Sequence, residues 1–248
     1  MKHPAIVQAS SLGARDVNED RVGHWLAPEA VLLAVADGLG GHMHGEVAAQ
    51  IGMEVLGAAF SAEARPKLDD PSRFMPRALS AAHAAIVRES ERRRYAENPR
   101  TVIAACVVQD DQVYWTHVGD CRFYLLRTGR IHVRSRDHTV VQQLVDQGRI
   151  REEAAASHPQ RNRLLACLGG YQIPRIEPVA SEKLAAGDIL LLCSDGFWGP
   201  LTLRQIMHPL LARPLAEAIP ELVQLAERTA GLECDNISVV AMVWNPSA

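Results

Sequence analysis

AVLLAVADG, residues 30–38, begins as a continuous apolar run and stops at Asp37-Gly38. An apolar run without alternation, bounded by a turn signal, is typical of a strand buried in a protein core. Asp37 therefore follows directly on a buried strand. Three other aspartates of the chain hold similar positions.

These other aspartates also lie beside apolar, strand-like segments. Asp120 follows residues 113–119, Asp195 follows residues 189–194, and Asp235 precedes residues 237–243. Glycine neighbours three of the four aspartates, and glycine lets a backbone carbonyl or an ion come close. Because strand ends on one rim of a sheet can direct several side chains to a common point, we expect the four carboxylates to converge.

A cluster of carboxylates favours a divalent cation. Carboxylates repel one another and are costly to bury together, and a divalent cation offsets that cost. Hard oxygen ligands are those that Mg²⁺ and Mn²⁺ prefer. The alternative for any single Asp-Gly or Gly-Asp pair is an ordinary turn. Four aspartates at strand ends, together with Asn18-Glu19-Asp20, favour the metal site.

The remaining segments predict hairpin-linked strands and separate helices. The expected strands are Ala5–Ala9, Val22–Leu26, Ala30–Ala36, Thr101–Val108, Val113–Val118, Arg122–Leu126, Ile131–Arg134, Arg175–Ala180, Ile189–Cys193 and Asn236–Val243. The expected helices are Glu46–Phe60, Phe74–Tyr95, Val140–Gly148 and Leu215–Thr229. This order favours antiparallel sheets with helices packed outside, rather than strict βαβ alternation. We expect residues 139–170, which are mostly polar, to leave the core as a lid.

Five short motifs occur in order along the chain. They are Arg15-Asp16-Val17-Asn18-Glu19-Asp20, Ala36-Asp37-Gly38-Leu39-Gly40-Gly41-His42, Val118-Gly119-Asp120, Ser194-Asp195-Gly196 and Cys234-Asp235-Asn236. Together they resemble the motifs of the 2C-type metal-dependent protein phosphatases (the PPM family), above all its bacterial single-domain members. The resemblance covers residues 5 to 244 and implies one domain over residues 1–248. It implies an α+β fold with two antiparallel β-sheets packed as a sandwich and helices on both outer faces, in the order α-β-β-α.

The resemblance also implies a role for each site residue. The catalytic residues would be Asp37, Asp195 and Asp235, and Arg15 would bind the substrate phosphate. The ligands of two core Mn²⁺ or Mg²⁺ ions would be Glu19, Asp37, Gly38, Asp195 and Asp235, with Asp37 bridging and Gly38 giving its carbonyl oxygen. Asp120 and Asp195 would form a possible third site, and Asp20 would orient ligands or water.

The reaction implied is hydrolysis of phosphoserine and phosphothreonine in proteins. A metal-bridging water would attack the phosphorus directly, with no phospho-enzyme. Phosphorylated proteins would be the substrates, including a bacterial Ser/Thr kinase and its targets. Some family members have a histidine directly after the Asp-Gly of the first metal motif, but this chain has Leu39 there. The general acid is therefore open, with His42 and His44 nearby in the sequence.

Composition excludes several other classes of protein. The chain has 248 residues, 48% hydrophobic and 22% charged, with a net charge of −3, which gives no basic excess for nucleic acid. No apolar run approaches the roughly 18 residues of a membrane span, and no signal peptide is evident, so we expect a cytoplasmic protein without a membrane partner. The five cysteines are scattered and predict buried thiols.

Three alternatives are weighed against this interpretation. A catalytically silent phosphoprotein-binding module of the same fold would lack a bridging carboxylate, yet Asp37, Asp195 and Asp235 are all present. A phosphatase acting on a non-peptide phosphoester stays open. A thiolate phosphatase would use Cys121 with Arg127, but the residues between them read as a strand rather than a phosphate loop.

Overall fold

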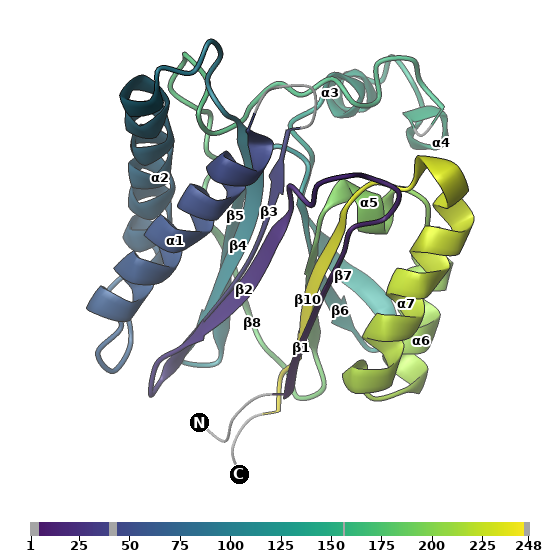
Figure 1. Cartoon of the computed structure of the whole chain (residues 1–248). Helices are drawn as coiled ribbons and strands as arrows, with labels where there is room; N and C mark the ends of the chain where they lie inside the picture. The colour runs from purple at the N-terminus through teal and green to yellow at the C-terminus, as the bar shows by residue number, and fades with distance from the viewer. Residues whose placement is uncertain (1–4, 40–43, 156, 246–248) are drawn as a thin grey trace.

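The computed structural model describes residues 5–39, 44–155 and 157–245. Two five-stranded antiparallel sheets face each other, and helices cover both outer faces (Figure 1). The first sheet has the strand order β1-β10-β9-β6-β7 and the second has the order β2-β3-β4-β5-β8. The described residues confirm the expected α-β-β-α sandwich.

The bounds of the elements are close to those expected from the sequence. The strands are β1 (Ala5–Ser11), β2 (Arg21–Leu26), β3 (Ala30–Gly38), β4 (Thr101–Gln109), β5 (Gln112–Val118), β6 (Arg122–Arg127), β7 (Arg130–Arg134), β8 (Ala180–Lys183), β9 (Ile189–Cys193) and β10 (Ile237–Val243). The α-helices are α1 (Gly45–Glu63), α2 (Pro71–Arg93), α3 (Val140–Asp146), α4 (Glu152–Ala155), α5 (Asp195–Trp198), α6 (Leu203–Ala212) and α7 (Leu215–Ala230).

Strand β3 explains why its sequence is continuously apolar. Alternate side chains of a strand point to opposite faces of the sheet. Leu32 and Ala34 pack with α1 and α2, whereas Val31, Leu33 and Val35 pack between the two sheets. Both faces of the strand are therefore covered, and the alternation continues into Asp37, whose side chain belongs to the inter-sheet side.

Two further apolar layers complete the molecule. Helices α6 and α7 cover the outer face of the first sheet, where Phe197, Ile219 and Leu222 are fully buried. Between the sheets, Trp115 stacks on Phe123 with ring centroids 4.8 Å apart. The C-terminal ends of β3, β5 and β9 lie at one edge of the sandwich, near α5 (Figure 1).

One strand prediction was wrong, and several helices were not predicted. The strand expected at Arg175–Ala180 forms instead at Ala180–Lys183, where it pairs with β5. Pro174 and Pro178 lack the N–H that a sheet ladder needs. Their presence disfavours a strand over the residues just before Ala180. Helix α6 was missed although Thr202 and Gln205 form a capping box at its start, which is a signal legible in the sequence.

Candidate metal centre

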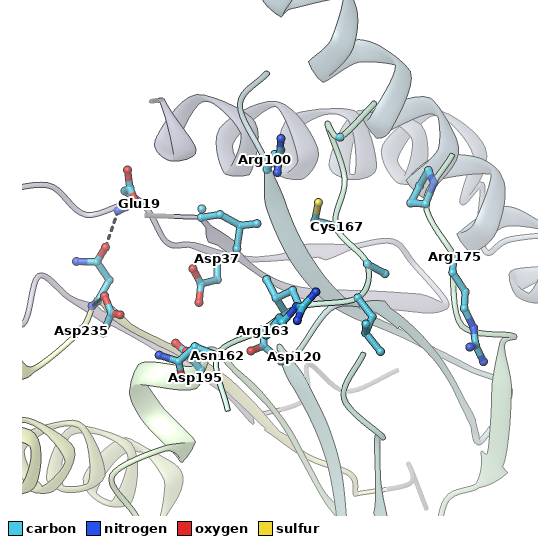
Figure 2. A pocket seen from close by; sticks show the side chains of 18 of the residues that line it. Glu19, Asp37, Arg100, Asp120, Asn162, Arg163, Cys167, Arg175, Asp195 and Asp235 are labelled. Atoms are coloured by element: carbon cyan, nitrogen blue, oxygen red, sulfur yellow. Dashed lines mark hydrogen bonds between the residues drawn. The ribbon is translucent and has the colours of Figure 1, made fainter. Parts of the chain in front are cut away.

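A cavity of about 1020 Å³ opens at the edge of the sandwich where the strand ends meet. Five acidic residues predicted as metal ligands line it together: Glu19, Asp37, Asp120, Asp195 and Asp235. They come from the loop before β2, the end of β3, the turn after β5, the start of α5 and the residue pair before β10. Figure 2 shows these side chains around one end of the cavity. Residues far apart in the sequence are thus brought to the wall of one cavity.

The backbone around Asp37 is held tightly. Thr101 donates its hydroxyl hydrogen to the Asp37 carbonyl over 2.6 Å, and the Gly38 N–H donates to the Glu19 carbonyl over 3.2 Å. A Cβ on Gly38 would lie 2.4 Å from the carbonyl carbon of Gly45. Only glycine fits here, because the start of α1 packs directly on the end of β3.

Asp20 lies beneath the cavity and does not line it. Its side chain is 3% exposed and accepts a hydrogen bond of 2.7 Å from the Ser194 hydroxyl. The same hydroxyl oxygen accepts from the Ser238 N–H over 2.9 Å. Asp20 therefore connects the first motif with the ends of β9 and β10.

The loop before β2 is fastened to the residues before β10. The Glu19 N–H donates to the Asn236 side-chain oxygen over 2.8 Å, drawn as a dashed line in Figure 2. Arg15 Nη2 donates to Asp235 Oδ2 over 2.7 Å, and both side chains are about half exposed. Arg15 thus lies at the mouth of the cavity, next to a predicted ligand.

Asp120 is positioned by aromatic and imidazole groups. The Trp198 indole N–H donates to the Asp120 carbonyl over 3.1 Å, and the Arg122 guanidinium lies 3.3 Å from the Trp198 ring centroid. Gly119 has φ +96, and its N–H and carbonyl both bond to His138. These contacts connect Trp198 and His138 to the Asp120 turn, a link that the sequence did not reveal.

Burial, followed by mutual repulsion, raises the pKa values of the buried carboxylates. Burial comes first for Asp37, followed by repulsion from Asp20, Asp195 and Asp120, and together they hold its pKa well above the ordinary value. The pKa of Asp120 is also held well above its ordinary value, mainly by burial and next by repulsion from Asp195. Burial raises the pKa of Asp195, assisted by Asp235, although a hydrogen bond with Asp37 acts in the opposite direction.

The donor set fits hard divalent cations. The cavity end presents five carboxylates, and repulsion between buried carboxylates is what a divalent cation relieves. Within residues 5–39, 44–155 and 157–245, no three acidic, imidazole or thiol side chains meet closely enough to hold an ion as they stand. The individual ligand roles therefore stay predictions.

The cavity lining identifies no imidazole as the general acid. Leu39 lines the cavity, and none of its described lining residues is a histidine. His44 stacks on Tyr95 with ring centroids 4.0 Å apart, and His42 lies outside the described residues. The segment expected as a lid contributes residues 162–167 to the cavity wall, and closure over the site stays a prediction.

The cysteines are not placed for thiolate chemistry. Cys121 is 1% exposed, and burial raises its pKa well above the ordinary value. Arg127 is bound instead to Asp188, over 2.8 Å. These contacts confirm that Cys121 and Arg127 do not form the phosphate-binding loop of a cysteine phosphatase. In the described part of the chain, no helix is long and apolar enough to cross a bilayer.

Comparisons with known proteins identify the family of the chain. A family model described as protein phosphatase 2C matches residues 7–227. Serine/threonine protein phosphatase PstP of Mycobacterium tuberculosis is 38% identical over 212 residues, which are 85% of this chain and 40% of PstP. Protein phosphatase PhpP of Streptococcus pneumoniae is 29% identical over 93% of each chain.

A solved structure extends the likeness to the fold. The catalytic domain of PstP in complex with two manganese ions superposes with a TM-score of 0.83 at 32% identity, covering 98% of each chain. The likeness therefore extends over almost the whole fold. The chain spans 40% of the length of the whole PstP protein.

Proposed function

Since the chain belongs to the protein phosphatase 2C family, we propose that it is a metal-dependent phosphatase that hydrolyses phosphoserine and phosphothreonine in proteins. The observation that supports this most strongly is the convergence of five carboxylates at one end of a cavity whose mouth holds Arg15. Phosphorylated proteins are the proposed substrates, including a Ser/Thr kinase and its targets.

The carboxylates are assigned to three tasks: binding two core cations, binding a third cation, and holding the Asp195 loop in place. Asp37, Asp195, Asp235 and Glu19 face the cavity, and we assign them to two core cations together with the Gly38 carbonyl. Asp120 faces the same cavity next to Asp195 and is assigned to a third, weaker site. Asp20 is occupied by Ser194 and fits the task of fixing the Asp195 loop in place.

Divalent cations held there, Mn²⁺ or Mg²⁺, supply Lewis-acid polarisation of the phosphoryl oxygens and an activated water. The protein's own groups bind and orient the substrate. Arg15 donates to Asp235 through Nη2 alone, and its other N–H groups have no acceptor among the residues that the structure describes. A planar guanidinium matches the oxygens of a phosphate, so Arg15 is assigned to hold the scissile group.

The structure disfavours a silent binding module. The three aspartates assigned to the two core cations line the cavity together with Asp120, and burial and mutual repulsion raise the pKa values of Asp37, Asp120 and Asp195. Such an arrangement is destabilising without a cation, and a module that only binds phosphoproteins has no need of it. The presence of this buried cluster therefore favours a catalytic protein over a binding module.

The test is hydrolysis of a phosphothreonine peptide with Mn²⁺, with EDTA, and by the Asp37→Asn variant. Activity that requires metal and falls at least a thousandfold in the variant supports the proposal. Asp69→Asn serves as the matched control, because Asp69 is exposed and outside the cavity lining. A wild-type protein that Mn²⁺ stabilises against heat but that hydrolyses no phosphopeptide would instead favour a binding module or a phosphatase acting on a non-peptide phosphoester.

A further inference from the structure

The cavity has a second end that the proposed hydrolysis does not use. Its lining includes Arg100, Arg163 and Arg175; Figure 2 draws Arg100 and Arg175 away from Glu19 and Asp235, and draws Arg163 beside Asp120, where the acidic side chains end. The arginines come from the residue before β4 and from the segment that follows α4. Between residues 162 and 175 the chain has no aspartate or glutamate. One cavity therefore has an acidic end and a basic end.

The positive charge at this end is only weakly neutralised by the protein. In the described ranges, neither Arg100 nor Arg163 forms an ion pair, and the Arg175 guanidinium lies 3.9 Å from Glu177 with its side chain 78% exposed. The Arg100 Nε is buried without a hydrogen-bond partner. That nitrogen is closed to solvent, so an anion in the cavity would bind the remaining N–H groups of Arg100.

The basic end is also shaped to receive a peptide. Tyr171 is 75% exposed, and the Arg100 guanidinium lies 6.0 Å from the centroid of its ring. Leu165 and Ile173 are exposed beside it and line the same cavity. Exposed apolar side chains around charged groups are typical of a binding surface. The cavity, about 1020 Å³, is at the upper end of the roughly 300–1,000 Å³ of ligand pockets, far more than one phosphoryl group fills.

We infer that Arg100, Arg163 and Arg175 form a subsite for a second anionic side chain of the substrate, a phosphorylated residue or a carboxylate, on the same peptide as the scissile phosphate. This inference rests on the proposed phosphatase function and names its substrate class. Arginines suit a second phosphate, since guanidinium groups bind phosphate through paired N–H donors.

The test uses phosphothreonine peptides that differ at one other position. The second position, moved from two to six residues on either side, is phosphoserine, glutamate or alanine, and kcat/KM is measured at saturating Mn²⁺. We expect the phosphoserine peptide to exceed the alanine peptide roughly tenfold at one spacing, and less at high salt. The glutamate peptides distinguish a carboxylate from a phosphate as the natural anion.

The variant Arg163→Gln/Arg175→Gln identifies the residues responsible. Both side chains are exposed, so the fold is expected to tolerate the change, and the preference for the second anion should fall to about twofold or less. Arg130→Gln/Arg204→Gln removes the same charge from exposed positions outside the cavity lining and should keep the preference. Equal rates on all peptides, or a preference that survives in the first variant, would overturn the inference.

Binding to the Asp37→Asn variant separates this inference from the proposed function. Affinity for the same peptides is measured by fluorescence anisotropy, which needs no turnover. Tighter binding of the peptide with two anions supports the subsite even if hydrolysis of every peptide fails. Equal affinities for the singly and doubly anionic peptides overturn the subsite, while hydrolysis of the singly phosphorylated peptide still upholds the phosphatase.

Discussion

Ser194 donates a hydrogen bond of 2.7 Å to Asp20, and the two residues are 174 positions apart in the sequence. Both are buried, and the Ser194 oxygen also accepts from the Ser238 N–H. This contact fixes the residue before Asp195 to the residue after Glu19. Two of the proposed ligand positions thus depend on one hydroxyl group that itself does not reach the cavity.

Replacing that hydroxyl is expected to weaken both the fold and the site. Ser194→Ala leaves the Asp20 carboxylate and the Ser238 N–H without their partner, which costs about 1–3 kcal/mol in the free energy of unfolding. Urea denaturation measures this loss, and Mn²⁺ titration of activity should show weaker metal binding. Ser61→Ala on the exposed face of α1 is the control and should change stability by less than about 0.5 kcal/mol. Unchanged stability and metal affinity in Ser194→Ala would contradict this role.

Stability without metal should fall as the pH rises. Burial raises the pKa of Asp20 to about 7 from an ordinary value of 3.8, which lies close to its value in the unfolded chain. Between these values the folded protein binds more protons than the unfolded chain, so the free energy of unfolding decreases with increasing pH. The raised pKa values of Asp37 and Asp120 act in the same direction.

The melting temperature in EDTA should therefore be higher at pH 5 than at pH 8. The increase produced by Mn²⁺ should be larger at pH 8, where fewer protons have to leave the carboxylates before they bind the cation. Thermal unfolding at both pH values, with and without Mn²⁺, measures the two effects. A metal-free protein that is more stable at pH 8 than at pH 5 would contradict the assignment.

Much of the site was predictable because its residues mark the ends of buried strands. The apolar run of β3 indicates a strand covered on both faces, and Asp37 follows it directly. The same relation holds for Asp195 after β9 and for Asp235 just before β10. The ordered motifs then pointed to the family, and the family implied the sandwich.

What could not be predicted depends on contacts between distant segments. The bond between Asp20 and Ser194 has no local signature, because each partner is an ordinary polar residue in its own segment. The basic end of the cavity joins Arg100 to Arg163 and Arg175 only after the chain folds. Strand β8 begins at Ala180 because its partner is Trp115 on β5, and no pattern within residues 175–183 specifies that register.

Gly196 is expected to tolerate no side chain. A Cβ there would lie 2.0 Å from the Asn236 carbonyl oxygen, so α5 and the residues before β10 would have to separate. Gly196→Ala should cost at least about 1–3 kcal/mol in the free energy of unfolding and reduce metal-dependent activity. Gly52→Ala is the matched control, because its Cβ would meet only the Thr101 methyl group, at 3.8 Å. Since Gly52 lies inside α1, this change should stabilise the protein by about 0.5–1 kcal/mol. Equal effects of the two changes would argue against the close packing at Gly196.

Replacing Arg15 should lower kcat/KM for the phosphopeptide without weakening the binding of Mn²⁺. It pairs with Asp235, and its charge lowers the pKa of Glu19 and Asp195 against the effect of burial. Arg15→Ala removes the proposed phosphate donor, so kcat/KM at saturating Mn²⁺ should fall roughly 10- to 100-fold. The same change removes a positive charge that competes for Asp235, so the concentration of Mn²⁺ needed for half-maximal activity should stay the same or decrease.

The Arg88→Ala variant provides the control for this prediction, because Arg88 is exposed on α2 and does not line the cavity. Both kcat/KM and the Mn²⁺ requirement should stay close to the wild-type values. If Arg15 were only a structural partner of Asp235, its loss would instead raise the Mn²⁺ requirement, and saturating metal would restore kcat/KM. The two effects are measured in one titration, since Mn²⁺ concentration and phosphopeptide concentration can be varied independently. A fall in kcat/KM that persists at saturating metal therefore separates binding of the phosphate from support of the metal centre.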